Sequence, residues 1–280
     1  MASITVVTTF HKPGLEIYGQ RFLDSFAQNV DKRIKLIVYT EDCEPVNPDP
    51  EQITILDQKT ALPKLMAFKE QWKNVPKANG VCPPEIRARR PKDWQKEFKW
   101  HAVRFSNKVY SVFDACARRT GTWVVWMDAD SYIHSDWSYD NFKRLLPENK
   151  YITYVGRGKG SQTWPECGFY GLNMNHPVCH SFLEEFERMY EDAERGIFTL
   201  EEWHDSFVFG EVLKKFKDFN AAYDYSADMY MREAKTGGGG HPLINTELGK
   251  YMDHMKGDRK KDGRSKQSDI MVNRNEEYWK

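Results

Sequence analysis

Residues 123–133 read WVVWMDADSYI, an apolar run followed by the carboxylates Asp128 and Asp130. The apolar run predicts a buried β-strand that ends where the aspartates begin. In an open α/β sheet, ligands bind at the carboxyl ends of the strands, so we expect both carboxylates at a binding edge. Side chains two residues apart on an extended chain share a side, which lets both carboxylates address one cation. Oxygen ligands suit Mg²⁺ or Mn²⁺, although Asp is also common at simple strand-to-turn junctions.

The segments around this strand predict an α/β fold with a mostly parallel sheet flanked by helices. β-branched and apolar runs predict further strands at 4–10, 34–39, 53–56, 151–155 and 169–174. Apolar residues at helical spacing predict helices over 15–28, 98–117, 176–195 and 201–216. The early strand–helix–strand–strand order, with connections long enough for crossovers, favours parallel pairing. Prolines and arginines predict a loop at 73–97, and glycines predict loops at 156–160 and 237–240.

Composition limits the class of protein. The 280 residues carry 41 Lys and Arg and 41 Asp and Glu, so a globally basic nucleic-acid-binding coat is excluded. Nine Trp exclude a disordered chain, and no apolar run approaches the roughly 20 residues that span a membrane. The N-terminal MASITVVTTF reads as a first strand rather than a signal peptide. Five cysteines without a CxxC pair argue against a disulfide framework, so we expect a cytoplasmic protein.

A second motif lies late in the chain. Residues 254–260 read HMKGDRK and fit the pattern HxxGxxK through His254, Gly257 and Lys260. The imidazole offers a neutral nitrogen to a metal, the glycine allows close backbone approach to a phosphate, and the lysine supplies a point charge. Taken alone, the same stretch fits a solvated basic tail.

A mid-chain apolar strand ending in DxD, together with a late HxxGxxK, resembles glycosyltransferases of the GT-A fold. The glycogenin and lipopolysaccharide-galactosyltransferase type is the nearest. The resemblance implies one Rossmann-like α/β domain, with a nucleotide-sugar-binding half at 1–135 and an acceptor half with a metal- and diphosphate-binding tail at 136–280. It implies that a sugar moves from a nucleotide-diphosphate sugar, by default a UDP-sugar, to an acceptor hydroxyl, with retention. The residues that it assigns to Mn²⁺ (or Mg²⁺) are Asp128, Asp130 and His254, and those that contact the diphosphate are Gly257 and Lys260.

Further positions match the family less specifically. The resemblance places a basic residue near the donor sugar, either Lys108 or Arg104, and places Asp205 opposite the reacting sugar. Asp205 fits a helix N-cap equally well. If the enzyme inverts instead, it needs a carboxylate base at the acceptor hydroxyl, and Asp205 or Glu166 could serve; His204 is a candidate for polarising that hydroxyl. Inversion and retention both stay open. Trp164 and the loop at 166–171 are candidates for contact with the acceptor. The end of the first strand would meet the base and ribose through Thr8, Thr9, Phe10 and Tyr18.

Two other classes of protein fit parts of the sequence. A phosphohydrolase of the haloacid-dehalogenase type also uses a strand-terminal DxD, but there the motif opens the chain. A nucleic-acid-binding module could use the basic, Trp-bearing segments 87–104 and 255–266, alone or to hold a nucleic-acid acceptor. The acceptor therefore stays open among saccharide, protein, lipid-linked glycan and modified nucleobase, and the oligomeric state stays open too.

Overall fold

The computed structural model describes residues 3–89, 97–118, 121–157, 164–216, 221–226 and 242–280. A seven-stranded sheet forms its centre, in the order β3-β2-β1-β4-β7-β6-β8. Parallel pairing joins β1 to β2 and β4, β2 to β3, and β6 to β8, whereas β7 is antiparallel to β4 and β6. The predicted α/β class, with a mostly parallel sheet flanked by helices, is confirmed. The strands are β1 (Ile4–His11), β2 (Ile34–Glu41), β3 (Ile53–Asp57), β4 (Trp123–Met127), β6 (Ile152–Val155), β7 (Glu166–Asn173) and β8 (Ala222–Asp224).

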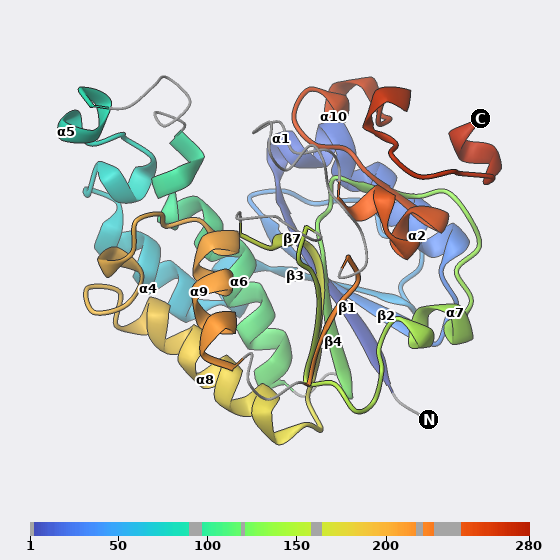
Figure 1. The fold of residues 1–280 in the computed structure, drawn as a ribbon, viewed down its shortest axis with the longest axis horizontal. Coiled ribbons are helices and arrows are strands. Elements are labelled where there is room, and N and C mark those ends of the chain that lie inside the picture. Colours follow the sequence, from blue (N-terminus) through green and yellow to red (C-terminus); the bar gives the residue numbers. More distant parts are fainter. Residues whose placement is uncertain (1–2, 90–96, 119–120, 158–163, 217–220, 227–241) are drawn as a thin grey trace.

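Helices cover both faces of this sheet (Figure 1). Four longer helices pack on one face: α4 (Pro63–Trp72), α6 (Ala102–Ala117), α8 (Pro177–Glu191) and α9 (Asp205–Phe216). The other face is covered by α2 (Gln20–Asn29), α7 (Tyr139–Arg144) and the segment around 243–252. The remaining α-helices are the short α1 (Lys12–Gly14), α3 (Gln58–Ala61), α5 (Pro84–Arg87) and α10 (Arg259–Asp262).

The central strands alternate between two cores. In β4, Val124 and Trp126 pack toward α6 and α8, while Trp123, Val125 and Met127 pack toward α2 and α7. All five residues of β4 are buried, which follows from a strand covered on both faces. This is why the stretch before the aspartates is apolar throughout rather than alternating.

Several predicted boundaries were wrong. Helix α6 begins at Ala102 rather than 98, and α9 begins at Asp205 rather than 201. Strand β7 begins at Glu166, three residues before the predicted strand. The predicted loop at 73–97 contains a 3₁₀ turn (Lys77–Asn79) and α5, while its residues 90–96 lie outside the described part, as do 158–160 and 237–240 from the predicted glycine loops.

A two-stranded sheet was missed by the sequence prediction. It pairs β5 (Ser131–Ile133) with β9 (Met252–His254), antiparallel, and so joins the middle of the chain to its late part. None of the helices within the described residues is both long and apolar enough to cross a membrane.

Candidate metal centre and adjoining cavity

The two motifs of the sequence, DxD and HxxGxxK, meet through this small sheet. Strand β4 ends at Met127, and the backbone turns through Ala129 before β5 begins at Ser131. Ser131 lies opposite His254 in the β5–β9 pairing, and the Met255 N–H donates to the Asp130 carbonyl at 2.9 Å. The aspartates are thus held on a turn between two strands, and not on the extended chain that the sequence suggested.

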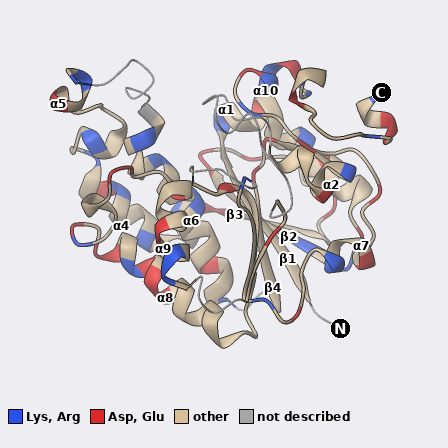
Figure 2. Ribbon diagram, viewed as in Figure 1, with Lys and Arg blue, Asp and Glu red and all other residues tan. Residues whose placement is uncertain are grey.

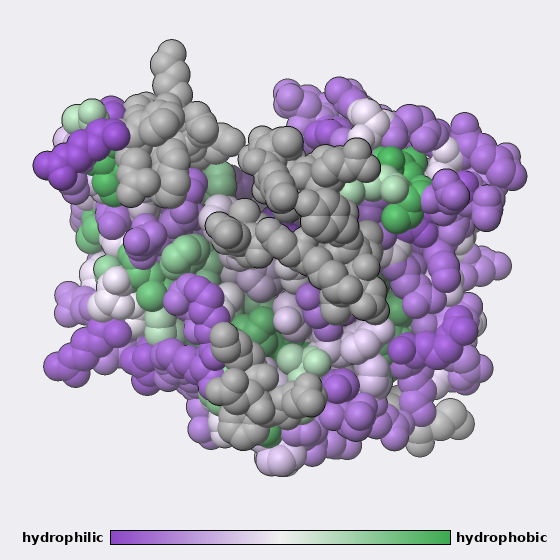
Figure 3. Space-filling view, viewed as in Figure 1, coloured by the Kyte–Doolittle hydropathy of each residue, from purple (hydrophilic) through white to green (hydrophobic). Residues whose placement is uncertain are grey.

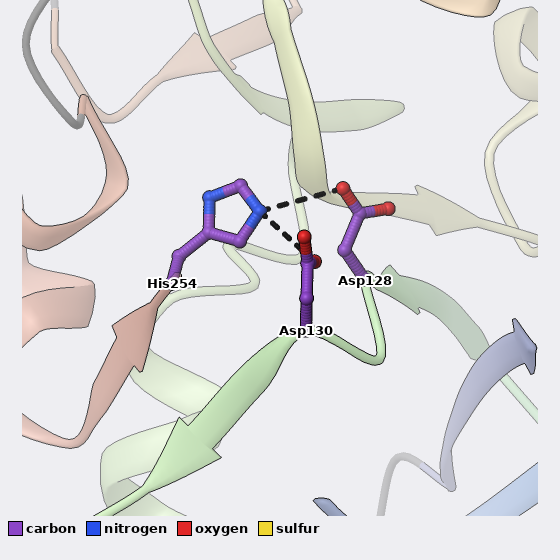
Figure 4. Close-up of side chains that lie close together, drawn as sticks. All are labelled: Asp128, Asp130 and His254. Carbon is purple, nitrogen blue, oxygen red and sulfur yellow. Dashed lines mark ion pairs between the residues drawn. The ribbon is translucent and has the colours of Figure 1, made fainter. Parts of the chain in front are cut away.

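Asp128, Asp130 and His254 form one cluster (Figure 4). His254 Nε2 lies 3.5 Å from Asp128 Oδ2 and 3.3 Å from Asp130 Oδ1. Each residue offers one potential ligand atom, and these three atoms all lie within 4.8 Å of one another. Two carboxylates and an imidazole make a mixed oxygen and nitrogen donor set that Mn²⁺ accepts readily, and the carboxylates also suit Mg²⁺. The residues present therefore fit a divalent cation.

The charged groups of the cluster shift one another's pKa values. Burial lowers the pKa of His254, but the adjacent Asp130 and Asp128 carboxylates raise it more, to about 9. Burial raises the pKa of Asp130, but His254 and Lys260 lower it further, below its ordinary range. The protonated imidazole of His254 is therefore a counter-ion of the two aspartates. To ligate a metal cation, the imidazole would have to lose this proton.

Two lysines bracket the aspartates. Lys260 Nζ lies 2.7 Å from Asp130 Oδ2. On the other side, Lys108 Nζ lies 3.1 Å from Asp128 Oδ1 and 2.8 Å from Asp205 Oδ2. Burial disfavours the charged form of Lys108, but Asp128 and Asp205 outweigh it and raise the lysine pKa above its ordinary value. Lys108 is therefore a fixed positive charge between two carboxylates.

A cavity of about 210 Å³ opens beside this row of charges. It lies at the carboxyl ends of β1, β2 and β4, the position expected for a ligand in an open α/β sheet. Eight of the predicted site residues line it: Thr9, Phe10, Tyr18, Arg104, Lys108, Asp128, Asp130 and Lys260. Thr8 is buried within the sheet instead, and Gly257 lies outside the cavity wall with a left-handed φ of 59°.

Other residues of the cavity wall were not predicted. His11 and Glu41 face the cavity from the ends of β1 and β2, where they are register partners. The rule that ligands bind at carboxyl strand ends would have found both. Trp126 also lines the cavity, and its Nε1–H donates to Asp128 Oδ1 at 2.6 Å. No spacing in the sequence signals that contact, because the indole reaches past its own strand end.

Glu166, His204 and Asp205 are not among the residues that line the cavity. Glu166 is buried and forms ion pairs with Lys256 and, at 2.9 Å, with Arg157 Nη2. Burial raises the pKa of Glu166, but these two cations outweigh it and lower the pKa to about 2. Asp205 begins α9 and pairs with Lys108.

His204 has protein partners at both ring nitrogens. Its Nε2 lies 3.0 Å from Glu202 Oε2, and its Nδ1 accepts the Phe207 N–H at 3.4 Å. The imidazole of His204 therefore takes the N-capping position that the sequence offered to Asp205 as an alternative role.

No family model and no curated protein matches the sequence. Several solved structures of glycosyltransferases are similar to the chain in fold, at low sequence identity. The bifunctional glycosyltransferase WbbM is 13% identical with a TM-score of 0.44, over 80% of this chain and 38% of that one. Mouse xyloside xylosyltransferase 1 is 11% identical with a TM-score of 0.40, over 79% and 84%. The glycosyltransferase GlyE of Streptococcus pneumoniae TIGR4 is 8% identical with a TM-score of 0.43, over 80% and 45%.

These structural neighbours are glycosyltransferases, and the chain spans less than half the length of WbbM and GlyE. The similarity concerns the outline of the fold alone. The argument about function rests on the geometry of the cluster and its cavity.

Proposed function

We propose that this protein is a metal-dependent glycosyltransferase, which moves a sugar from a nucleoside-diphosphate sugar to an acceptor hydroxyl. One observation carries the proposal. Asp128, Asp130, His254 and Lys260 come from two motifs far apart in the sequence and converge in one cluster, of which Asp128, Asp130 and Lys260 line a cavity at the carboxyl ends of the strands. A divalent-cation site with a lysine beside it is what the recognition of a diphosphate requires.

The diphosphate would lie between the metal centre and Lys260. Asp128, Asp130 and His254 would hold Mn²⁺ or Mg²⁺, and the cation, when bound, would supply Lewis-acid stabilisation of the leaving diphosphate. Lys260 would move its ammonium from Asp130 to a phosphate oxygen, where negative charge grows as the sugar leaves. Gly257 precedes α10 in a left-handed conformation, with open space where a Cβ would be, so its backbone can approach a phosphate closely.

The nucleoside would occupy the end of the cavity formed by β1 and the following helical turns. Thr9 and Phe10 lie near the carboxyl end of β1, and Tyr18 lines the same cavity from the π-helical turn Leu15–Gly19. The Lys260 ammonium lies 5.2 Å from the centre of the Tyr18 ring, so the ring adjoins the proposed diphosphate position. An aromatic ring there can stack on the base, and we take UDP as the nucleotide to test first.

The reacting sugar would lie toward Lys108 and Asp205. Lys108 reaches the cavity, and its ion pair with Asp205 at 2.8 Å fixes the position of that carboxylate. Glu166 is held by two cations with a pKa of about 2, which makes it a weak proton acceptor, and both nitrogens of His204 are engaged. Because the candidate bases are committed to other partners, we propose transfer with retention, in which Asp205 stabilises positive charge at the sugar.

Thermal unfolding with paired ligands tests this proposal. We expect Mn²⁺ together with UDP or a UDP-sugar to raise the Tm more than the sum of the two added alone, since a cation and a diphosphate share one site. EDTA should remove the effect. Equal shifts with and without Mn²⁺ would contradict the metal-dependent diphosphate site. Hydrolysis of p-nitrophenyl phosphate without any nucleotide binding would favour the phosphohydrolase instead.

A further inference from the structure

Four partly exposed aromatic side chains surround His204 next to the proposed donor site. The ring centroids of Trp164, Phe98, Phe105 and Phe207 lie 4.6, 5.3, 6.0 and 6.2 Å from that of His204, and Trp164 also meets Phe207 at 6.2 Å. We call these four residues the aromatic platform. They come from three separate segments of the chain, so the fold assembles them rather than local sequence.

A buried chain of polar side chains holds His204, the residue at the centre of the platform. Lys99 pairs with Glu202, and the other carboxylate oxygen of Glu202 contacts His204 Nε2 at 3.0 Å. The side chains of all three are at most 10% exposed. The Trp203 N–H donates to the Lys99 carbonyl at 2.6 Å, which ties the two segments together. A buried ion pair such as Lys99–Glu202 is unfavourable unless its hydrogen bonds are well formed. The contact between Glu202 and His204 therefore keeps the His204 ring in place.

The aromatic platform continues the wall of the donor cavity. Phe105 belongs to both, and it lies one helical turn before Lys108 on α6. His204 directly precedes Asp205, which pairs with Lys108 at 2.8 Å. A ring resting on the platform would therefore lie beside the two residues that we assign to the reacting sugar.

The charges around the platform favour an uncharged ligand. Lys99, whose ammonium lies 5.3 Å from the centre of the Trp164 ring, is paired with Glu202. Arg157 donates to the Trp164 carbonyl and shares the Glu166 carboxylate with Lys256. A nucleic-acid strand would need cations that are available to neutralise its phosphates. These cations already have carboxylate partners, and Arg104, whose Cζ lies 5.9 Å from the centre of the Phe105 ring, is on the side of the donor cavity, which it lines.

The wider surface agrees with this picture. Among the described residues, Figure 2 shows acidic and basic residues mixed over α4, α8 and α9. Figure 3 shows hydrophobic residues near α9 on a mainly hydrophilic face. Such a surface suits a polar, neutral molecule that has one apolar side.

From these observations we infer that the aromatic platform binds a neutral sugar ring of the acceptor. This inference rests on the proposed glycosyltransferase function and specifies its acceptor. The apolar face of a sugar ring would pack on Trp164 and Phe207, and its hydroxyls would face solvent and the donor. Large aromatic side chains offer such contact at little cost in conformational entropy.

Transfer assays with an acceptor panel test the inference. The full chain is incubated with Mn²⁺, a labelled UDP-sugar that it binds, and a panel of neutral mono- and oligosaccharides beside single-stranded oligonucleotides. We expect transfer to members of the saccharide panel. Trp164→Ala and Phe207→Ala should each raise the KM for the saccharide acceptor about tenfold or more, as truncation of an aromatic anchor does. Their Kd for UDP in Mn²⁺ should stay within about twofold of the wild-type value, since the platform lies beyond the nucleotide.

A matched control and two contrary outcomes complete the test. Tyr223→Ala removes an exposed aromatic residue of β8, which is outside the platform, and should leave the acceptor KM unchanged. Unaltered acceptor KM in both platform variants, or transfer to no neutral saccharide, would overturn the inference. So would transfer to oligonucleotides that falls steeply with salt. Failure of the wild-type chain to bind UDP with Mn²⁺ would instead contradict the proposed function itself.

Discussion

Gly168 shows how closely the metal centre is fitted at the scale of one residue. A Cβ at this position of β7 would lie 2.7 Å from His254 Cε1, closer than real Cβ contacts allow. The imidazole is buried and cannot move aside freely. We expect Gly168→Ala to push His254 away from the two aspartates and to weaken Mn²⁺ binding by roughly tenfold to a hundredfold, as changes next to metal ligands do.

The same strand offers a matched control. Gly171 is equally confined, but its Cβ would meet Leu146 and Thr153 at 2.8 Å, in the sheet core away from His254. Gly171→Ala should lower the Tm and leave the Mn²⁺ affinity unchanged. Electron paramagnetic resonance of free Mn²⁺ measures the affinity for both variants. Equal affinities in Gly168→Ala and the wild type would show that His254 is not a ligand.

Asp130 pairs with two cationic side chains at the centre of the cluster. It faces His254 Nε2 at 3.3 Å and Lys260 Nζ at 2.7 Å. Asp130→Asn keeps the shape of the side chain and removes its charge, so both groups lose this carboxylate partner. We expect Mn²⁺ binding to weaken by more than about a hundredfold, because a ligand rather than its neighbour is lost. Isothermal titration measures this, with the exposed Asp258→Asn as the control. An unchanged Kd would exclude Asp130 as a ligand.

At the scale of elements, sequence patterns predicted the long strands and helices and missed what joins them. The apolar run of β4 is unmistakable because both faces of that strand are buried. The helix starts at 98 and 201 were predicted too early, because the capping residues are His101 and His204, whose ring nitrogens accept backbone N–H groups. Histidine is not among the usual N-cap residues, so the sequence does not signal that a helix starts there.

The candidate site was predictable as two motifs but not as one arrangement. Strands β5 and β9 are three residues long, too short for periodicity to reveal. Their pairing brings Ser131 opposite His254 across more than a hundred residues of chain. Only the resemblance to a known family linked DxD with HxxGxxK in the sequence; the structure supplies the contact through a pairing that no local pattern encodes.

The β9 strand is anchored on its far side by the C-terminal segment. Asp253 is fully buried and accepts hydrogen bonds from the Ser265 N–H at 2.7 Å, the Ser265 hydroxyl at 2.5 Å and the Tyr278 hydroxyl at 2.8 Å. Neighbouring residues of a strand point to opposite sides, so this anchor holds the strand that presents His254 to the aspartates. Ser265 and Tyr278 therefore support the strand that carries His254 through their hydrogen bonds to Asp253.

Removing two of these donors tests the anchor. The double variant Ser265→Ala, Tyr278→Phe leaves the Asp253 carboxylate buried with fewer partners. We expect a loss of about 2–4 kcal/mol in the free energy of unfolding, from the cost of unsatisfied buried polar groups. Mn²⁺ affinity should fall as well, since β9 loses its fixed position. Tyr223→Phe, on an exposed tyrosine, serves as the control. Destabilisation with unchanged Mn²⁺ affinity would show that the anchor does not position His254.

At the scale of the whole molecule, the sheet separates the residues proposed to contact the sugars from those that support the metal centre. The α4–α6–α8–α9 side carries Lys108, Asp205 and the aromatic platform, and the α2–α7 side carries the C-terminal segment that holds β9. The metal centre lies at the strand ends where these two sides meet. Zero net charge in the sequence is consistent with this, because the carboxylates and lysines of the site neutralise one another locally.

The stability of this assembly should depend on pH through His134, where the C-terminal segment packs on β5. Its ring stacks on Tyr278 with centroids 4.3 Å apart, and it faces the charged groups Asp253, Glu276 and Arg274. Burial outweighs the two carboxylates and lowers the His134 pKa from 6.5 to about 4. Between these values the unfolded chain binds a proton that the folded chain does not, so the free energy of unfolding falls as the pH falls through this window. We expect a contribution on the order of 1–2 kcal/mol, allowing for the partial exposure of the ring.

Urea unfolding of His134→Gln at several pH values measures this contribution, since the variant should lose that part of the pH dependence. The exposed His180→Gln serves as the control and should keep the wild-type profile. A His134→Gln profile parallel to that of the wild type would mean that the histidine is not held neutral beneath the C-terminal segment.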